Sequence, residues 1–196
     1  QDIYVHFSYD STHRAKGFYC SANDGLPDFW KLGIVKPGGL DLKALGCQVG
    51  HRDIVVALER FEDVDLAMVQ QQMTRAAQYF ASIDVKNPDG TKGIALHFIY
   101  PTPWSQKDHA AIMGDFDGHF PRHEHRGIVH TMFAENGGPL VSAINGDRGH
   151  FNGHWQEFLH EFGHQLDLVH DGFYGSPSYN SDTGCAMYPS LMSYSY

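Results

Sequence analysis

The residues with the clearest chemical potential are 160–164, which read His-Glu-Phe-Gly-His and match the pattern H-E-x-x-H. On an α-helix, residues four apart lie on one face, so His160 and His164 can present two imidazoles to one metal ion. Glu161 then lies beside them, and its carboxylate can hold a water molecule. A zinc ion with such ligands lowers the pKa of bound water toward about 7 and polarises a carbonyl group. We therefore expect a catalytic metal site on this segment.

A zinc ion of this kind needs a third protein ligand and an open fourth position. His170 follows His164 by six residues and is the favoured third ligand, whereas Asp171 and Asp182 stay open as alternatives. No Glu follows Glu161, which excludes the class of zinc site that takes a distal Glu.

The metal motif needs a helix to position it, and the surrounding apolar residues predict one. They recur with helical spacing and form a single stripe, which comprises Trp155, Phe158, Leu159, Phe162 and Leu166. Such a stripe is typical of a helix that lies on a sheet. Gly163 removes side-chain bulk inside the motif.

The residues before this helix predict a parallel β-sheet. Strands are expected at 53–59 and 93–100, and the helical spacing of the apolar residues between them predicts an amphipathic helix with Leu66, Val69, Met73, Ala76, Ala77 and Phe80 on one side. This strand–helix–strand order implies parallel strands and a right-handed crossover. Two more short strands are expected at 127–134 and 140–144. Residues 1–50 read as an N-terminal extension, and the last thirty residues as irregular.

Residues 160–170 resemble the metzincin signature H-E-x-x-H-x-x-G-x-x-H, with Asp167 in place of the glycine. Asp adopts left-handed backbone conformations more readily than most residues but less readily than Gly, so the turn after the helix can differ from that of the family. Residues 24–30, 41–46, 52–56 and 87–90 are also similar to stretches that precede H-E-x-G-H in secreted proteins. The resemblance favours a secreted protein.

Residues 190–194 (S-L-M-S-Y) are similar to the Met-turn of serralysins and of a broader group of secreted bacterial metallopeptidases. The resemblance implies that Met192 passes beneath a zinc ion held by His160, His164 and His170. It also implies that Tyr194 is a hinged metal ligand or a donor to the transition state. Gly163 and Asp167 would support this site.

The resemblance further implies an α/β (α+β) fold with a twisted mixed sheet, two long helices, one of which carries the active site, and a small irregular lower subdomain after the third His. Within one catalytic domain, residues 51–170 would form the upper subdomain and 171–196 the lower one. The implied function is that of a zinc-dependent endopeptidase with Glu161 as general base. A protein or peptide substrate would bind extended along a sheet edge, supplied by either 127–134 or 139–145.

Two other functions stay open. The chain could be a non-catalytic binding module that keeps the metzincin scaffold, or a zinc-dependent amidase or deacetylase that uses the same zinc-activated water. Glu161 favours catalysis over the binding module, because a degenerate scaffold has little reason to keep a general base.

Composition limits the partners of the chain. Its 196 residues suit one domain, and 42% apolar residues are enough for a core. A net charge of −9 leaves no broad basic surface, so nucleic acid is not expected as a partner. No apolar run approaches the roughly 20 residues of a membrane helix, so no membrane partner is expected either. We expect a monomer.

The three cysteines allow at most one internal disulfide. Residues 24–28 resemble a calcium loop, but Cys20, Ala22 and Lys31 stand where carboxylates would be expected, so neither calcium nor a second metal ion is favoured. By the same resemblance, a Cys20–Cys47 disulfide could replace the lost metal and leave Cys185 unpaired. Pairing of either cysteine with Cys185, or three free thiols, stays open.

The chain contains 14 His, and most of them lie outside the motif. A second group is expected to be a solvated loop rather than a metal site, and comprises His119, His123, His125 and His130 with Asp115 and Asp117. His97 is expected to be a hydrogen-bonded core histidine. His150 and His154 either line the cleft or mark the beginning of the helix.

Overall fold

The computed structural model describes residues 20–110, 125, 127–136, 141–142, 148–166 and 168. In chain order the elements are α1 (Asp28–Lys31), the 3-10 helix η1 (Pro37–Gly39), β1 (Asp53–Arg60), α2 (Leu66–Ser82), β2 (Ala95–Ile99), the 3-10 helix η2 (Gln106–Asp108), β3 (Val129–Ala134), β4 (Val141–Ser142), β5 (Arg148–Phe151) and α4 (Trp155–Gln165). This is the mixed α/β fold that the sequence predicts.

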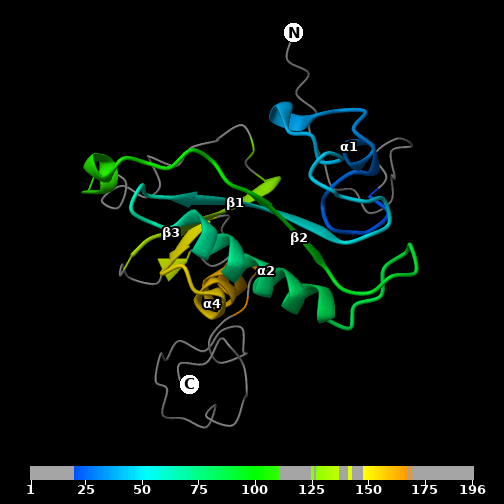
Figure 1. Ribbon diagram of the computed structural model, residues 1–196. Helices are drawn as coiled ribbons and strands as arrows, with labels where there is room; N and C mark the ends of the chain where they lie inside the picture. Colours follow the sequence, from blue (N-terminus) through cyan, green and yellow to red (C-terminus); the bar gives the residue numbers. More distant parts are fainter. Residues whose placement is uncertain are drawn as a thin grey trace, which may run out of the picture.

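The strands form one sheet in the order β2-β1-β3-β5-β4 (Figure 1). β1 pairs in parallel with both β2 and β3, and β3 pairs in parallel with β5, so the predicted parallel pairing of the first two strands is confirmed. β4 pairs antiparallel with β5 and forms one edge. β5 was not predicted, because its residues Arg-Gly-His-Phe have no alternating apolar pattern.

Helix α2 begins where Asp65 caps it, since the Asp65 carboxylate accepts a hydrogen bond from the backbone N–H of Ala67. It buries Val69, Met73, Ala76 and Phe80, as its apolar spacing predicts. α2 and α4 lie on the same side of the sheet (Figure 1). Among the described residues, no helix combines the length and the apolar character that a membrane span requires.

The sheet is covered on both faces. Val56 and Leu58 of β1 point to the side of α2 and α4 and belong to the larger core cluster. Val55 and Ala57 point to the opposite side, where Leu42 packs against them. Residues 20–50, read from the sequence as an extension, therefore contribute to the core, and α1 lies on their side of the sheet (Figure 1).

Candidate metal centre

Helix α4 carries the metal motif and is held by aromatic packing. It lies against β5, β4 and β3, and on its far side it contacts α2. Phe158 and Phe162 are fully buried, and their stacked rings lie 5.1 Å apart. The predicted apolar stripe is thus confirmed. Its packing sets the orientation of α4 and therefore the direction in which His160 and His164 project.

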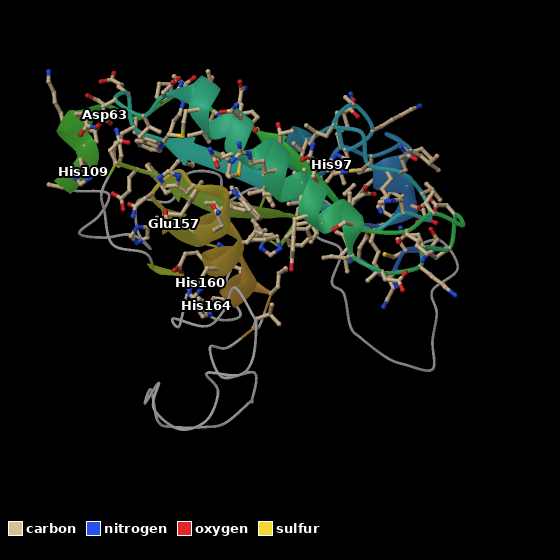
Figure 2. All side chains as sticks on the ribbon, turned by 60° about the horizontal axis from the view of Figure 1, so that its bottom comes forward. Asp63, His97, His109, Glu157, His160 and His164 are labelled. Atoms are coloured by element: carbon tan, nitrogen blue, oxygen red, sulfur yellow. The ribbon has the colours of Figure 1, made fainter. Side chains whose placement is uncertain are left out.

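His160 and His164 are brought together as the motif predicts (Figure 2). Their ring centroids lie 5.0 Å apart, and both side chains are mostly buried. The Nδ1 of His164 donates to the carbonyl oxygen of Leu168 at 2.8 Å, so its Nε2 keeps a lone pair for a ligand. Burial and the nearby His160 lower the pKa of His164. Together they outweigh the hydrogen bond to Leu168, which raises it. A neutral imidazole is the form that binds a metal.

The end of helix α4 places the Leu168 carbonyl. The backbone N–H groups of Leu166 and Leu168 both donate to the carbonyl oxygen of Gly163, at 3.1 and 2.9 Å. A bond that spans five residues in this way is typical of a helix C-terminus. The backbone carbonyl of Gly163, one of the residues expected to support the site, thus ends the helix and positions Leu168.

Glu161 is buried beside this pair, with its Oε1 3.8 Å from the Nε2 of His160. The pKa of Glu161 is raised to about 7, mainly by burial, with a contribution from Glu157 in the same direction and an opposing one from His150. A carboxyl group with such a pKa can accept and return a proton near neutral pH. The geometry therefore suits the predicted general base.

A second acidic residue near the site was missed by the sequence analysis. Glu135 follows β3 directly and is buried, and its Oε1 bonds the Nδ1 of His150 at 2.7 Å. Its Oε2 lies 3.4 Å from the Nε2 of His109. Since His150 is close enough to Glu161 to lower its pKa, of the two roles left open for His150 the structure favours lining the site. Only the position of Glu135 at a strand end could have indicated it from sequence.

The other sequence-predicted histidines have separate contacts. His154 is exposed at the N-cap of α4 and makes no capping bond through its side chain. His130 bonds Gln165 of α4 at 3.0 Å. His125 is buried and bonds the carbonyl oxygen of Gly38 at 3.0 Å. The expectation of a solvated loop is therefore wrong for both residues, because His130 belongs to β3 and His125 contacts the N-terminal segment. His119, His123, Asp115 and Asp117 lie outside the described residues.

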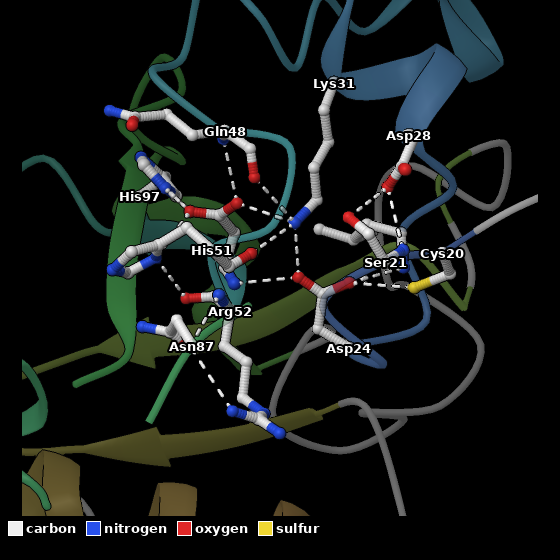
Figure 3. Close-up of polar contacts among 12 residues, drawn as sticks. Cys20, Ser21, Asp24, Asp28, Lys31, Gln48, His51, Arg52, Asn87 and His97 are labelled. Carbon is white, nitrogen blue, oxygen red and sulfur yellow. Dashed lines mark hydrogen bonds and ion pairs between the residues drawn. The ribbon is translucent and has the colours of Figure 1, made fainter. Parts of the chain in front are cut away.

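The predicted Cys20–Cys47 disulfide is not formed in the structure, where both are free thiols. The Cys20 thiol donates to Asp24 at 3.2 Å instead. The cross-link that the disulfide was expected to provide comes from the buried Lys31, whose Nζ bonds Asp24 and Asp53 (Figure 3). The Lys31 ammonium group thus joins a carboxylate of the calcium-loop-like segment to the first residue of β1.

Several predicted site residues lie outside the described residues. They are His170, Asp167, Met192 and Tyr194, together with the alternative ligands Asp171 and Asp182 and the cysteine Cys185. The described part of the centre consequently consists of two imidazoles and one buried carboxylate from α4, with His150 and Glu135 beside them.

Comparison of the sequence with protein-family models, with curated proteins and with solved structures gives no match. The function of the chain therefore has to be inferred from its own residues. Within the described part, α4 brings two imidazoles and a buried carboxylate together.

Proposed function

We propose that this chain is a zinc-dependent endopeptidase of the metzincin type, with His160, His164 and His170 as metal ligands. The observation that carries the proposal is the pair of imidazoles on one face of α4, with Glu161 buried beside them. The mixed sheet with two helices on one face is consistent with the fold that the metzincin resemblance implies.

The chemistry follows from the positions of these side chains. Zinc, when bound, supplies the positive charge that acidifies water and polarises the carbonyl of a peptide bond. Glu161 takes a proton from the attacking water and returns it to the leaving amine. Tyr194 is proposed to donate to the developing oxyanion, and Met192 would support the residues that hold the ion, as the metzincin resemblance implies. The bond from His164 to Leu168 keeps one imidazole in the tautomer that binds metal.

The substrate is proposed to be a protein or peptide in extended conformation. Of the two segments considered, β3 is paired on both sides, whereas β4 is at an edge and lies against α4. We therefore propose that the substrate adds a strand to β4, through main-chain hydrogen bonds. We propose that the enzyme is secreted and acts as a monomer.

The decisive experiment compares wild type with Glu161→Gln and Glu157→Gln on a general protein substrate, with zinc and with a chelator. We expect Glu161→Gln to lower hydrolysis by about 10²–10⁴-fold while zinc binding is retained, since a general base contributes this much. Glu157 lies on the same helix and accepts a hydrogen bond from the backbone N–H of Asn152. Because the amide oxygen of Gln can accept the same bond, the activity of Glu157→Gln should stay within a few-fold of wild type.

Three outcomes would contradict the proposal. Undiminished activity of Glu161→Gln would remove the general base. Zinc binding by a wild type without hydrolytic activity would favour the binding module. Zinc-dependent hydrolysis of acetylated amines or other non-peptide amides, with no cleavage of proteins, would favour the amidase.

A further inference from the structure

Three side chains of metal-ligating type meet on the face of the sheet that points away from α4, where His97 lies in register with Val55. Cys47 comes from the loop before β1, Asp53 is the first residue of β1, and His97 lies in β2. Their ligand atoms all lie within 4.8 Å of one another. Figure 2 shows His97 far from His160 and His164, so this cluster is separate from the centre on α4.

Both ring nitrogens of His97 are hydrogen-bonded, and a cation could replace the proton at one of them. Its Nδ1 lies 2.9 Å from the carbonyl oxygen of Leu45, which can only accept, so this nitrogen is the donor. Its Nε2 lies 2.8 Å from Oδ1 of Asp53 (Figure 3). A proton fills the space between Nε2 and the carboxylate in the metal-free protein. An imidazole that donates one N–H to a backbone carbonyl and turns the other nitrogen to a shared ligand site is typical of metal-binding histidines.

Cys47 completes the cluster with a buried sulfur. Burial, with a smaller contribution from Asp53, raises the pKa of its thiol to about 12, and the opposing effect of Lys31 is outweighed. Within the described residues, no hydrogen bond to the Cys47 sulfur is found. A thiol in this position becomes a thiolate only when a strong positive charge is bound to it, as a coordinated metal ion provides.

The charges around the cluster are balanced when a divalent cation is present. Oδ2 of Asp53 is bound by Lys31 at 2.7 Å and by the backbone N–H of Gln48 at 2.9 Å, while Oδ1 faces His97. Lys31 also pairs with Asp24. Two carboxylates and one thiolate match one ammonium and one divalent cation. The metal-free group, with a neutral thiol and a proton between His97 and Asp53, has the same net charge, so an ion can exchange for two protons without leaving an uncompensated buried charge.

We propose that Cys47, Asp53 and His97 bind one thiophilic divalent cation of the zinc class. The mixed sulfur, nitrogen and oxygen donors favour such an ion over calcium or magnesium. Binding replaces the thiol proton of Cys47 and the proton between His97 and Asp53, so two protons leave for each ion that enters. The ion ties the loop before β1 to β1 and β2, and its role is structural. This proposal does not depend on the function proposed for α4.

The test is a titration of the metal-free, reduced protein with Co²⁺, because a thiolate ligand gives a cobalt charge-transfer band in the near ultraviolet. We expect the band in wild type and in the His160→Ala/His164→Ala variant, and its loss in Cys47→Ala. Cys20→Ala and Cys185→Ala are matched controls that should keep it. In weakly buffered solution, the double His variant should release two protons for each Co²⁺ bound.

A second variant protects the test against misfolding of Cys47→Ala. His97→Gln keeps an N–H donor toward Asp53 but removes the imidazole, and we expect it to weaken Co²⁺ binding at least tenfold with the fold unchanged by circular dichroism. The proposal is overturned if wild type shows no cobalt–thiolate band, or if the band survives in Cys47→Ala.

Discussion

Lys31 is the residue on which the polar contacts of the N-terminal segment depend. Its side chain is fully buried, and its Nζ bonds the carbonyl oxygen of His51 at 2.6 Å in addition to Asp24 and Asp53. Burial lowers the pKa of Lys31, but its hydrogen bonds and charge contacts with the two carboxylates outweigh this, and the net pKa is raised. One ammonium group thus compensates two buried acids that come from different segments.

Lys31→Met should therefore destabilise the protein strongly. It leaves two buried carboxylates without their cation, and removal of one partner from a buried ion pair costs about 3–5 kcal/mol. Lys36→Met is the matched control, because the Lys36–Asp41 pair is exposed and should contribute little. Urea unfolding of both variants measures the difference, and equal midpoints would contradict the role of Lys31.

The pH dependence of stability should report on Asp53. Burial raises its pKa, but hydrogen bonds from His97, Lys31 and the backbone of Gln48 outweigh this and hold the pKa below its usual value of 3.8. A lowered pKa stabilises the fold above the unfolded value, and this stability is lost as the pH falls through the folded value. In the presence of a chelator, the free energy difference between wild type and Asp53→Asn should be largest near pH 7 and shrink below about pH 4. A difference that does not change with pH would refute this.

At the scale of elements, the connection from α2 to β2 depends on a close backbone approach. Gly93 has φ +89°, and a Cβ at this position would lie 2.2 Å from the carbonyl oxygen of Ala81 in α2. Its backbone N–H donates to Val85 at 2.9 Å, which holds the chain against the helix end. Only glycine permits both the conformation and the contact.

Gly93→Ala should cost about 3–5 kcal/mol, because backbone strain and a clash with the main chain add together. Gly90→Ala separates the two effects, since Gly90 has φ +88° but a Cβ there would meet no atom within 4 Å. We expect this control to lose only about 1–2 kcal/mol. Chemical denaturation provides both values, and similar losses would mean that the contact with Ala81 relaxes at little cost.

At the scale of the whole molecule, the N-terminal segment and the helices share one sheet and should unfold together. Leu42 is fully buried against Val55 and Ala57, so Leu42→Ala should cost about 2–5 kcal/mol. Leu32, which is 50% exposed, lies in the same segment, and Leu32→Ala should change stability by less than about 0.5 kcal/mol.

The readout is thermal unfolding followed by far-ultraviolet circular dichroism and by aromatic signals. We expect a single transition by both probes, which Leu42→Ala moves to lower temperature in full. If Leu42→Ala created an early transition of its own, residues 20–50 would be an independent unit, and the shared core would be refuted.

The sequence was enough to predict the features that depend on local spacing. β1, α2, β2 and α4 follow from apolar periodicity and turn residues, and the His160–His164 pair follows from the pitch of a helix. The parallel pairing of β1 and β2 could also be predicted, since a helix connects them and a crossover of this length joins parallel strands.

The tertiary structure decided the contacts between segments that are distant along the chain. β5 is recognised as a strand only because β3 and β4 lie on either side of it. The Glu135–His150 contact and the Lys31–Asp53 pair join different segments, and no local pattern encodes either one. The predicted Cys20–Cys47 disulfide was wrong for the same reason: hydrophobic spacing determines which residues are buried, but only the packed fold determines which buried groups meet.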